Sequence, residues 1–443
     1  MKMSPQQILI TGFTGVILLG GILLALPVSS AAGKFTNFID ALFTATSAVC
    51  VTGLIVVNTA THWSLFGKIV ICLLIQIGGL GYMTMATLLV IIVGRQITLQ
   101  DRMAFSEGLQ IFSFANIKEF ILYVVKITLL IELAGAVILS TKWVPEFGFI
   151  NGFGIAIFHA VSAFCNAGLS VFDTNLMNYA GSVTVNFAIT SLIILGGIGY
   201  VVMSDLVHYK KTHRLFLHTK VALLTTLILL VVGAFLIFVL EYNNPLTIGT
   251  LSLKDKILVS YFQSVSPRTA GFNTTDISAF TYPVLFIIVM LMFIGASPSG
   301  TGGGIKTTTA ATVYATIRAF FKSKKDVTIF KSTVSHDTVM KSLILTLAAV
   351  SFILFVTFLL LISEKREFLR TLFEVVSAFA TCGLSAAPGT PLSLSAFFSE
   401  YGKMMIIITM FVGRLGPLTI AAAILQESNS AKYRYAEDKI IIG

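Results

Sequence analysis

The sequence predicts an all-α membrane protein that crosses the bilayer several times and consists of four fused units. Three observations support this prediction. The composition is 56% hydrophobic and only 11% charged, with a mean hydropathy of +0.91, which is typical of a polytopic membrane protein. Long apolar runs recur along all 443 residues. A short glycine-containing motif also appears four times at a nearly constant spacing.

The repeated motif is clearest at its glycines, which are separated by 115, 103 and 112 residues. The four copies read SAVCVTGL at 47–54, SAFCNAGL at 162–169, VSPRTAGF at 265–272 and SAFATCGL at 377–384. Their aligned glycines are Gly53, Gly168, Gly271 and Gly383. Close helix packing would explain one such glycine. Four copies in one register indicate instead that the units surround a common pathway.

Each unit is expected to contain a membrane span, a short half-helix that ends at the glycine motif, and a second span. We place the four pore units at 1–94, 95–210, 211–325 and 326–443. The first unit opens with the apolar run Ile8–Val28, which is long enough to cross a roughly 30 Å hydrocarbon core. This run also has features of a signal peptide. The other units open with equivalent runs that cannot be signals, so we favour a span.

The half-helix of the first unit is expected from Asn37 to Val49, with Asn37 and Asp40 at the spacing of an N-terminal cap. It is too short to cross the membrane. Irregular backbone persists at membrane depth only where it is buried in protein or lines a water-filled cavity. The glycine turn after the half-helix is therefore expected to be re-entrant and to face the pathway.

The other segments follow the same order. The first unit ends with a span at 63–93 that is interrupted by IGGLGY at 77–82, and LGGIGY recurs at 195–200. The other expected spans are 119–140, 182–207, 219–240, 282–320, 339–362 and 400–426. The other half-helices are expected at 152–164, after the capping residues Ser252 and Asp255, and at 367–379. The prediction is eight transmembrane helices and four re-entrant pore loops around a pseudo-fourfold axis.

Basic residues set the expected orientation. An even number of crossings puts both termini on one side, and the segments on that side carry more Lys and Arg, so both termini should be cytoplasmic. The largest contribution comes from the connection at 306–341. We attribute most of this charge to topology and the remainder to an acidic lipid surface or a soluble partner. The pI of about 9.4 then requires no nucleic acid.

The four glycine turns predict a pathway for a cation. A cation that crosses a membrane exchanges its hydration shell for protein oxygens, and backbone carbonyls supply these without fixed charge. Glycine is needed because successive carbonyls that face one axis require backbone angles that are costly for other residues. The partially negative C-terminal ends of the half-helices also favour a cation. The expected filter residues are Val51, Thr52, Gly53, Asn166, Ala167, Gly168, Thr269, Ala270, Gly271, Thr381, Cys382 and Gly383.

A second signal lies at 294–306, which reads IGASPSGTGGGIK and cannot remain a regular helix. Because it follows the third filter in the descending span, we expect an intramembrane barrier beneath the filter. The candidate gate residues are Gly295, Ser297, Pro298, Gly300, Gly302, Gly303, Gly304 and Lys306. A phosphate-binding loop is disfavoured because Ile305 precedes Lys306 and no strand leads into the loop.

Arg414 occupies the matching place in the fourth unit, within FVGRLGPLT at 411–419. A charge this deep costs roughly 2.5–3.5 kcal/mol, so it should face a cavity or backbone carbonyls. We interpret Arg414 as an electrostatic brake on cations beneath the filter. The alternative is snorkelling to the interface, which the apolar and small residues before Gln426 make difficult.

Other charged residues receive simpler interpretations. Arg268 should be held away from the axis, by hydrogen bonds to Asp276 or Glu374. Glu132 and Glu241 are interpreted as surface carboxylates near the ends of spans.

The fourfold plan, together with TAGFN at 269–273 and GGGIKT at 302–307, resembles the Trk/Ktr/HKT superfamily of potassium transporters, most closely the bacterial KtrB subfamily. The resemblance covers nearly the whole chain. It implies potassium uptake across the bacterial cell membrane, with the potassium ion bound by the carbonyls of the filter. Members that admit sodium often carry serine in the first filter, so Gly53 indicates potassium.

The resemblance also implies partners. Subunits of this type form homodimers on a ring of cytosolic nucleotide-binding subunits (KtrA-like), where ATP or ADP shifts the gate. It assigns the gate to Gly295–Lys306 and the brake to Arg414. We expect no nucleotide site in this chain, and we take 306–341 and 427–443 as candidates for ring and dimer contacts. Sodium dependence is common in the family, but the sequence indicates no sodium site.

No nucleophile with a base and no metal-ligand cluster is visible, so we do not expect an enzyme. The alternative is a secondary symporter for a small solute, which also uses broken helices near the midplane. Four similar filters argue against it, because inverted-repeat symporters have two equivalent broken helices.

Overall fold

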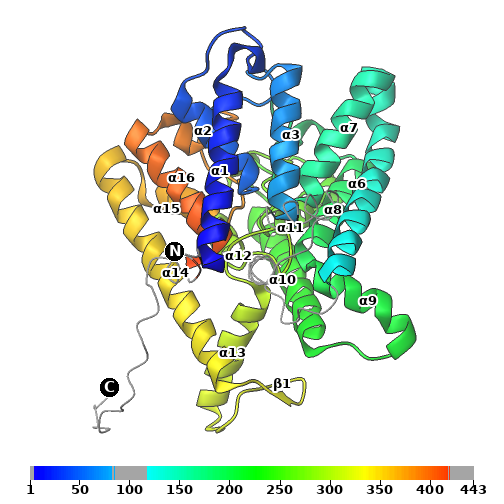
Figure 1. The fold of residues 1–443 in the computed structure, drawn as a ribbon, viewed down its shortest axis with the longest axis vertical. Helices are drawn as coiled ribbons and strands as arrows, with labels where there is room; N and C mark the ends of the chain where they lie inside the picture. Colours follow the sequence, from blue (N-terminus) through cyan, green and yellow to red (C-terminus); the bar gives the residue numbers. More distant parts are fainter. Residues whose placement is uncertain (1–3, 82–83, 85–116, 418, 420–443) are drawn as a thin grey trace.

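The computed structural model describes residues 4–81, 84, 117–417 and 419, and shows a mostly helical molecule (Figure 1). The first two units contain α1 (Pro5–Ala25), α2 (Phe38–Val49), α3 (Leu65–Leu80), α6 (Ile117–Phe147), α7 (Phe149–Phe164), α8 (Val183–Ile198) and α9 (Tyr200–Thr212). The last two contain α10 (Leu217–Glu241), α11 (Leu253–Val265), α12 (Tyr282–Phe293), α13 (Thr307–Phe321), α14 (His336–Glu364), α15 (Phe368–Phe379) and α16 (Glu400–Leu415). A small antiparallel hairpin, β1 (Thr328–Ile329) with β2 (Ser332–Thr333), follows α13.

Local capping explains where many of these helices begin. The side chain of Asn37 accepts a hydrogen bond from the Ile39 amide at the start of α2, and Ser252 accepts one from the Asp255 amide at the start of α11. The predicted half-helices are confirmed as helices, each starting and ending within a few residues of its expected limits.

The second long segment of each unit is broken. Left-handed glycines end α3 at Gly81, α8 at Gly199 and α16 at Gly416, and a loop separates α12 from α13. The axes of α8 and α9 differ by 94° across Gly199. Among the described residues, four helices, α1, α6, α10 and α14, are therefore long and apolar enough to cross a membrane alone, and the bent α8–α9 pair counts as a fifth span if it is taken as one. The expected spans 63–93 and 400–426 continue into residues outside the described part of the chain.

The units close into a ring. Within each unit the long helix contacts its own half-helix: α1 with α2, α6 with α7, α10 with α11 and α14 with α15. The next helix then contacts the half-helix of the following unit: α3 with α7, α8 with α11, α12 with α15 and finally α16 with α2. This cyclic pattern brings the four half-helices together around one centre.

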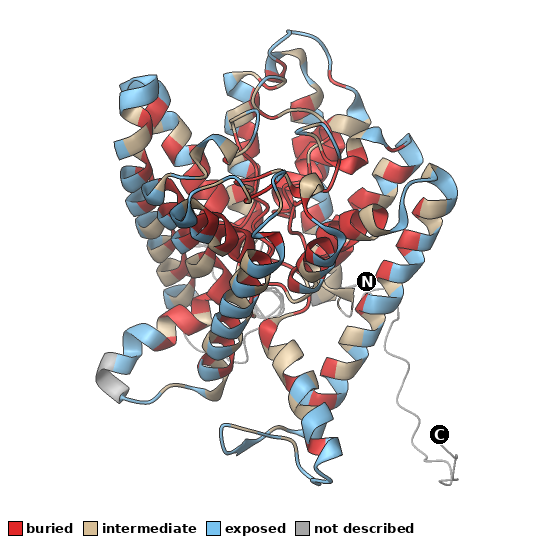
Figure 2. Cartoon of the chain, turned by 180° about the vertical axis from the view of Figure 1, so that it is seen from behind, coloured by how far each residue is buried: buried red, intermediate tan, exposed pale blue. Residues whose placement is uncertain are grey.

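Burial follows the same plan. Residues at the centre, where the half-helices end, are buried, whereas the long outer helices expose much of their surface (Figure 2). That surface is apolar, with Leu19, Leu130, Val231 and Leu347 each at least 59% exposed. An apolar outer face around a polar-backbone centre suits a molecule surrounded by hydrocarbon.

Candidate cation pathway

The four glycine turns share one unusual backbone conformation. Each contains two residues with positive φ, the glycine and the residue two positions before it. The φ values at Val51, Asn166, Thr269 and Thr381 are 55°, 61°, 69° and 50°, and those at Gly53, Gly168, Gly271 and Gly383 are 95°, 68°, 75° and 90°. Left-handed backbone costs a residue with a Cβ roughly 1–2 kcal/mol. The same cost at four equivalent places is typical of a functional site.

The turns form a closed ring of close contacts. A Cβ built on Gly53 would meet the carbonyl oxygen of Ala167, and one on Gly168 would meet that of Ala270. One on Gly271 would meet the oxygen of Cys382, and one on Gly383 would return to that of Thr52. All four approaches are closer than real Cβ atoms allow. Each glycine therefore leaves room for the carbonyl of the next unit, and the four turns surround one centre.

Serine hydroxyls form hydrogen bonds with the backbone of each turn. The amides of Gly53 and Gly383 each donate to a serine, Ser47 and Ser377, at 3.0 Å. In the second unit the hydroxyl of Ser162 instead donates to the Leu169 carbonyl at 2.8 Å. The third unit lacks serine at that position, and Ser266, one residue later, donates to the equivalent carbonyl of Phe272. A serine therefore fixes each turn, at the repeated position in three units and one residue later in the third unit.

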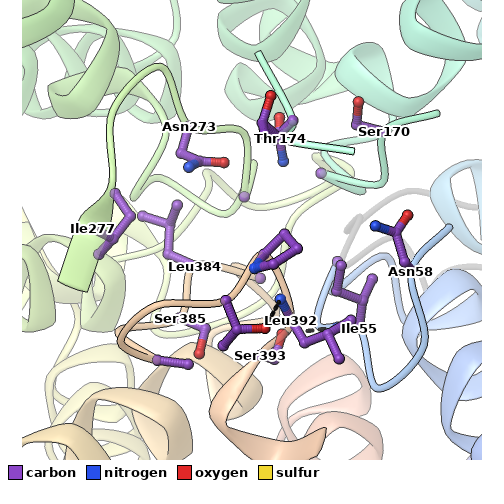
Figure 3. A pocket seen from close by; sticks show the side chains of 18 of the residues that line it. Ile55, Asn58, Ser170, Thr174, Asn273, Ile277, Leu384, Ser385, Leu392 and Ser393 are labelled. Carbon is purple, nitrogen blue, oxygen red and sulfur yellow. Dashed lines mark hydrogen bonds between the residues drawn. The ribbon is translucent and has the colours of Figure 1, made fainter. Parts of the chain in front are cut away.

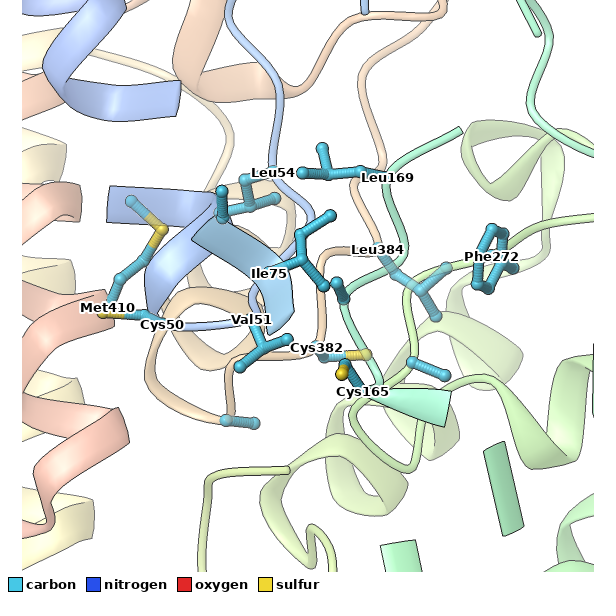
Figure 4. Packing of buried hydrophobic residues seen from close by; sticks show 14 of the residues in the cluster. Cys50, Val51, Leu54, Ile75, Cys165, Leu169, Phe272, Cys382, Leu384 and Met410 are labelled. Carbon is cyan, nitrogen blue, oxygen red and sulfur yellow. The ribbon is translucent and has the colours of Figure 1, made fainter. Parts of the chain in front are cut away.

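Apolar side chains follow each glycine and pack into the buried cluster around the turns (Figure 4). Leu54, Leu169, Phe272 and Leu384 are all at most 2% exposed. This packing, which sequence predicts only as a repeated apolar position, holds the strained turns in place.

A cavity of about 280 Å³ opens on one side of the ring and is lined by all four glycines. Polar side chains from the segments after the turns surround it, including Asn58, Thr174, Asn273 and Ser385 (Figure 3). Two carboxylates, Asp173 and Asp276, also line it. The sequence does not predict these residues as cavity lining, and it suggests Asp276 only as a hydrogen-bond partner of Arg268. Their shared feature, a polar side chain within a few residues after each glycine, is the signal that could have identified them.

The candidate gate loop, 294–306, lies on the opposite side of the ring. Its ends are joined by hydrogen bonds from the Gly295 amide to the Ile305 carbonyl at 2.9 Å and from the Ile305 amide to the Phe293 carbonyl at 3.2 Å. The middle of the loop is tied to filter residues, because the Gly303 amide donates to the Thr381 hydroxyl at 2.9 Å and Gly302 packs against Thr269.

The break in the second unit also holds the loop. Amides of Ser297 and Thr301 donate to the carbonyls of Gly197 and Gly196 at 2.9 and 3.2 Å, and the Tyr200 amide donates to Ser299 at 3.1 Å. The LGGIGY motif therefore holds the loop in place by backbone hydrogen bonds, a role that its sequence does not indicate.

Arg414 connects three units. Its guanidinium donates to the Thr301 carbonyl in the loop of the third unit and to the Gly78 carbonyl at the end of α3 in the first. Lys306 lies nearby and donates to the Gly302 carbonyl at 2.6 Å. Both basic residues, with Gly300, Gly302 and Gly304, line a second cavity of about 100 Å³. Carboxylates thus line one side of the ring and two cations line the other.

Three sequence interpretations are wrong: the hydrogen-bond partners of Arg268 and the surface placements of Glu132 and Glu241. Arg268 contacts neither proposed carboxylate; it donates to the Gly295 carbonyl at 3.3 Å. Asp276 instead caps Ser278, and the buried Glu374 accepts hydrogen bonds from Ser385 and Ser395. These serines satisfy Glu374 locally, so it needs no arginine.

Glu132 and Glu241 are buried, contrary to the expected surface placement. Glu132 accepts a hydrogen bond from Gln76 at 3.2 Å and lies 3.7 Å from the Cys165 sulfur, directly behind the second turn. Glu241 accepts hydrogen bonds from the hydroxyls of Thr247 and Thr281 at 2.7 and 2.6 Å. Both carboxylates therefore join segments distant in the chain.

The chain is similar to known cation transporters along its whole length. The family model described as TrkH, cation transport protein, matches residues 3–434. The chain is 41% identical to the Ktr system potassium uptake protein B of Vibrio alginolyticus, over 100% of this chain and 96% of the relative. It is 40% identical to the Ktr system potassium uptake protein B of Bacillus subtilis (strain 168), over 100% and 98%.

A solved structure shares the fold. The potassium transporter TrkH from Vibrio parahaemolyticus aligns with a TM-score of 0.72 and 18% identity, covering 94% of this chain and 85% of that one. At this identity the likeness shows a common fold. The chain belongs to the TrkH family of cation transport proteins, which are transporters and not enzymes.

Proposed function

We propose that this chain is the translocating subunit of a Ktr-type potassium uptake system in the bacterial cell membrane. The observation that carries the proposal is the closed ring of four left-handed glycine turns. Potassium would pass through this ring, with the backbone carbonyls of the twelve filter residues replacing its hydration shell. The names of the full-length relatives support potassium as the ion.

In this proposal the chain has eight crossings and four re-entrant half-helices. The breaks after α3, within α8–α9, between α12 and α13, and after α16 interrupt the second span of each unit. Both termini are cytoplasmic, which puts the 280 Å³ cavity outside and the gate loop inside. Asp173 and Asp276 then attract cations to the entrance.

We assign the closed state to the loop and Arg414. The loop would occupy the path beneath the ring, and the guanidinium would both pin Thr301 and repel a cation that leaves the filter. Opening requires the loop to leave its contacts with Gly196 and Gly197.

The partners follow from the proposed system. We infer a homodimer that rests on a cytosolic nucleotide-binding ring, with ATP or ADP bound by the ring. The basic connection 306–341 offers a contact for it. The other candidate, 427–443, lies outside the described residues.

Ion flux into liposomes that hold only the purified chain tests the proposal, with gradients of potassium and of sodium imposed separately. Potassium flux above sodium flux is expected. Flux of neither ion, even after the cytosolic ring is added back, would contradict the proposal. Solute-coupled uptake under those conditions would assign the chain to the symporters instead.

A further inference from the structure

A second large opening lies away from the pathway, between α10, α13 and the β1–β2 hairpin. Its volume is about 730 Å³. Apolar and aromatic side chains make up most of its walls, among them Leu224, Ile228, Leu229, Tyr314 and Ala315. Such a groove has the chemistry of a site for a hydrocarbon chain.

Basic side chains gather at one end of this groove. Arg318, Lys322 and Lys324 line it, and all three are exposed. None forms an ion pair with any described residue. Asp326 lies on the same connection, but it does not line the groove. The mouth therefore carries uncompensated positive charge.

The groove runs from the depth of the hydrocarbon core toward the membrane surface. Its α10 wall belongs to the first half of a helix with a mean hydropathy of 3.0, long enough to cross a membrane. From Ala310 to Lys322, α13 and its C-cap descend about 18 Å at 1.5 Å per residue. In Figure 1 the lower end of α13 and the hairpin extend below the other helices. The apolar walls thus lie at hydrocarbon depth and the basic mouth at the surface.

The inner end of the groove reaches the gate loop. Ile294, the first residue of the loop, is part of the lining. It is paired with Ile305 at the other end of the loop by an isolated parallel bridge. A ligand in the groove would therefore pack against the base of the loop.

We propose that this groove binds an anionic phospholipid. The phosphate of the headgroup contacts Arg318, Lys322 and Lys324, and one acyl chain follows Leu224, Ile228 and Tyr314 toward Ile294. A bound chain supports the Ile294–Ile305 pair and so stabilises the loop. The binding itself does not depend on the proposed transport function.

Native mass spectrometry of the full-length chain, purified in detergent, tests the binding. Phosphatidylglycerol and phosphatidylcholine are added separately, and retained lipid is counted. The double variant Arg318→Gln/Lys322→Gln removes two charges from the mouth. The matched control, Lys325→Gln/Lys331→Gln, removes two exposed charges from the same connection that do not line the groove.

The parent and the control should retain phosphatidylglycerol over phosphatidylcholine. The groove variant should bind it roughly 30-fold more weakly, as expected for two basic groups near an anionic surface. A second variant, Ala315→Trp, fills the apolar part, and it should lose both lipids while keeping the charge. If the double variant does not fold, Ala315→Trp still tests whether lipid binds in the groove.

Hydrogen exchange of 294–306 provides a readout independent of flux, and it should slow when phosphatidylglycerol is added to the parent but not to the groove variant. Equal retention of the two lipids by the parent would overturn the proposal and assign the basic mouth to a cytosolic protein. Equal losses in the groove variant and the control would also overturn it, because general surface charge would then explain the binding.

Discussion

At the four turn glycines, two physical requirements coincide. Each glycine has positive φ, and the position of its missing Cβ is taken by a carbonyl of the next unit. The first requirement disfavours any side chain energetically, and the second excludes it sterically. A substitution at one glycine therefore disturbs two neighbouring units, because the displaced carbonyl belongs to the other one.

Gly271→Ser should lower the preference for potassium over sodium by about tenfold, or about 1.4 kcal/mol. The serine Cβ would push on the carbonyl of Cys382 in the fourth unit. Fluxes of the two ions in liposomes measure the ratio. Gly154→Ser is the control, because a Cβ at Gly154 meets nothing within 4 Å. An unchanged ratio in Gly271→Ser would remove the third turn from the filter.

Arg414→Ala should raise potassium flux through the purified chain at least tenfold, because both the positive charge and the link from Thr301 to Gly78 are lost. Arg414→Lys separates these roles. Lysine keeps the charge but not the planar fork of donors that reaches two carbonyls at once. We expect it to raise flux less than alanine does, because the repelling charge remains while the link between Thr301 and Gly78 is lost.

A lysine variant with parental flux would assign the effect to charge alone. Thermal unfolding should accompany the flux measurements. Loss of folded protein in both variants would indicate a structural role for Arg414.

Sequence predicts the turn ring but not its buried carboxylates. The glycines are identifiable because one motif is repeated four times. Glu132 occurs once, and its place along a span does not say which face it occupies. Only the packing of α3, α6 and α7 shows that it contacts Gln76 and lies beside Cys165.

At the scale of elements, the helices and the loop differ in how far local sequence defines them. The half-helices are predictable, because apolar runs and caps such as Asn37 and Ser252 are local signals. The loop is predictable only as a break, from Pro298 and its glycines. Its position depends on carbonyls of Gly196 and Gly197, about a hundred residues earlier in the chain, which no local pattern specifies.

Deletion of Thr301–Gly304 should raise basal potassium flux, since it removes the segment that contacts Thr269, Thr381 and Arg414. Flux through the purified chain measures the effect. Thr301→Ser is the matched control, because it keeps both the hydroxyl that donates to the Phe164 carbonyl and the carbonyl that accepts from Arg414. Basal flux that stays low after the deletion, in a chain that still unfolds cooperatively, would show that the loop is not the barrier.

At the scale of the whole molecule, one interface joins the last unit to the first, and we call this contact between α16 and α2 the seam. Contacts between α16 and α2 close the ring, and Lys403 of α16 forms an ion pair with Asp40 of α2 at 2.7 Å. Both side chains are mostly buried, with 16% and 22% exposed. This pair therefore links segments more than 350 residues apart at the closing contact of the ring.

The variants Lys403→Ala, Asp40→Ala and the double variant form a thermodynamic cycle for this seam. We expect a coupling energy of about 1 kcal/mol, above that of most exposed pairs because solvent screening is reduced. Thermal unfolding in detergent measures it. The cycle on Arg370 and Glu367, a pair within one helix terminus, is the control and should leave closure of the ring unaffected. Additive effects at Lys403 and Asp40 would show that the seam does not depend on this pair.

In the proposed pathway, the closing contact also determines when a growing polypeptide becomes able to conduct ions. The fourth turn, at Gly383, borders both Gly53 and Gly271, so it completes the circle of oxygens only after most of the chain has been synthesised. In the proposed filter, a nascent chain that stops earlier would have three turns and an open side, and it would lack the full set of oxygens that replaces water around an ion. Units that insert in order from the N-terminus thus cannot assemble a selective pore ahead of time. The order of translation would therefore keep partly synthesised chains from conducting ions.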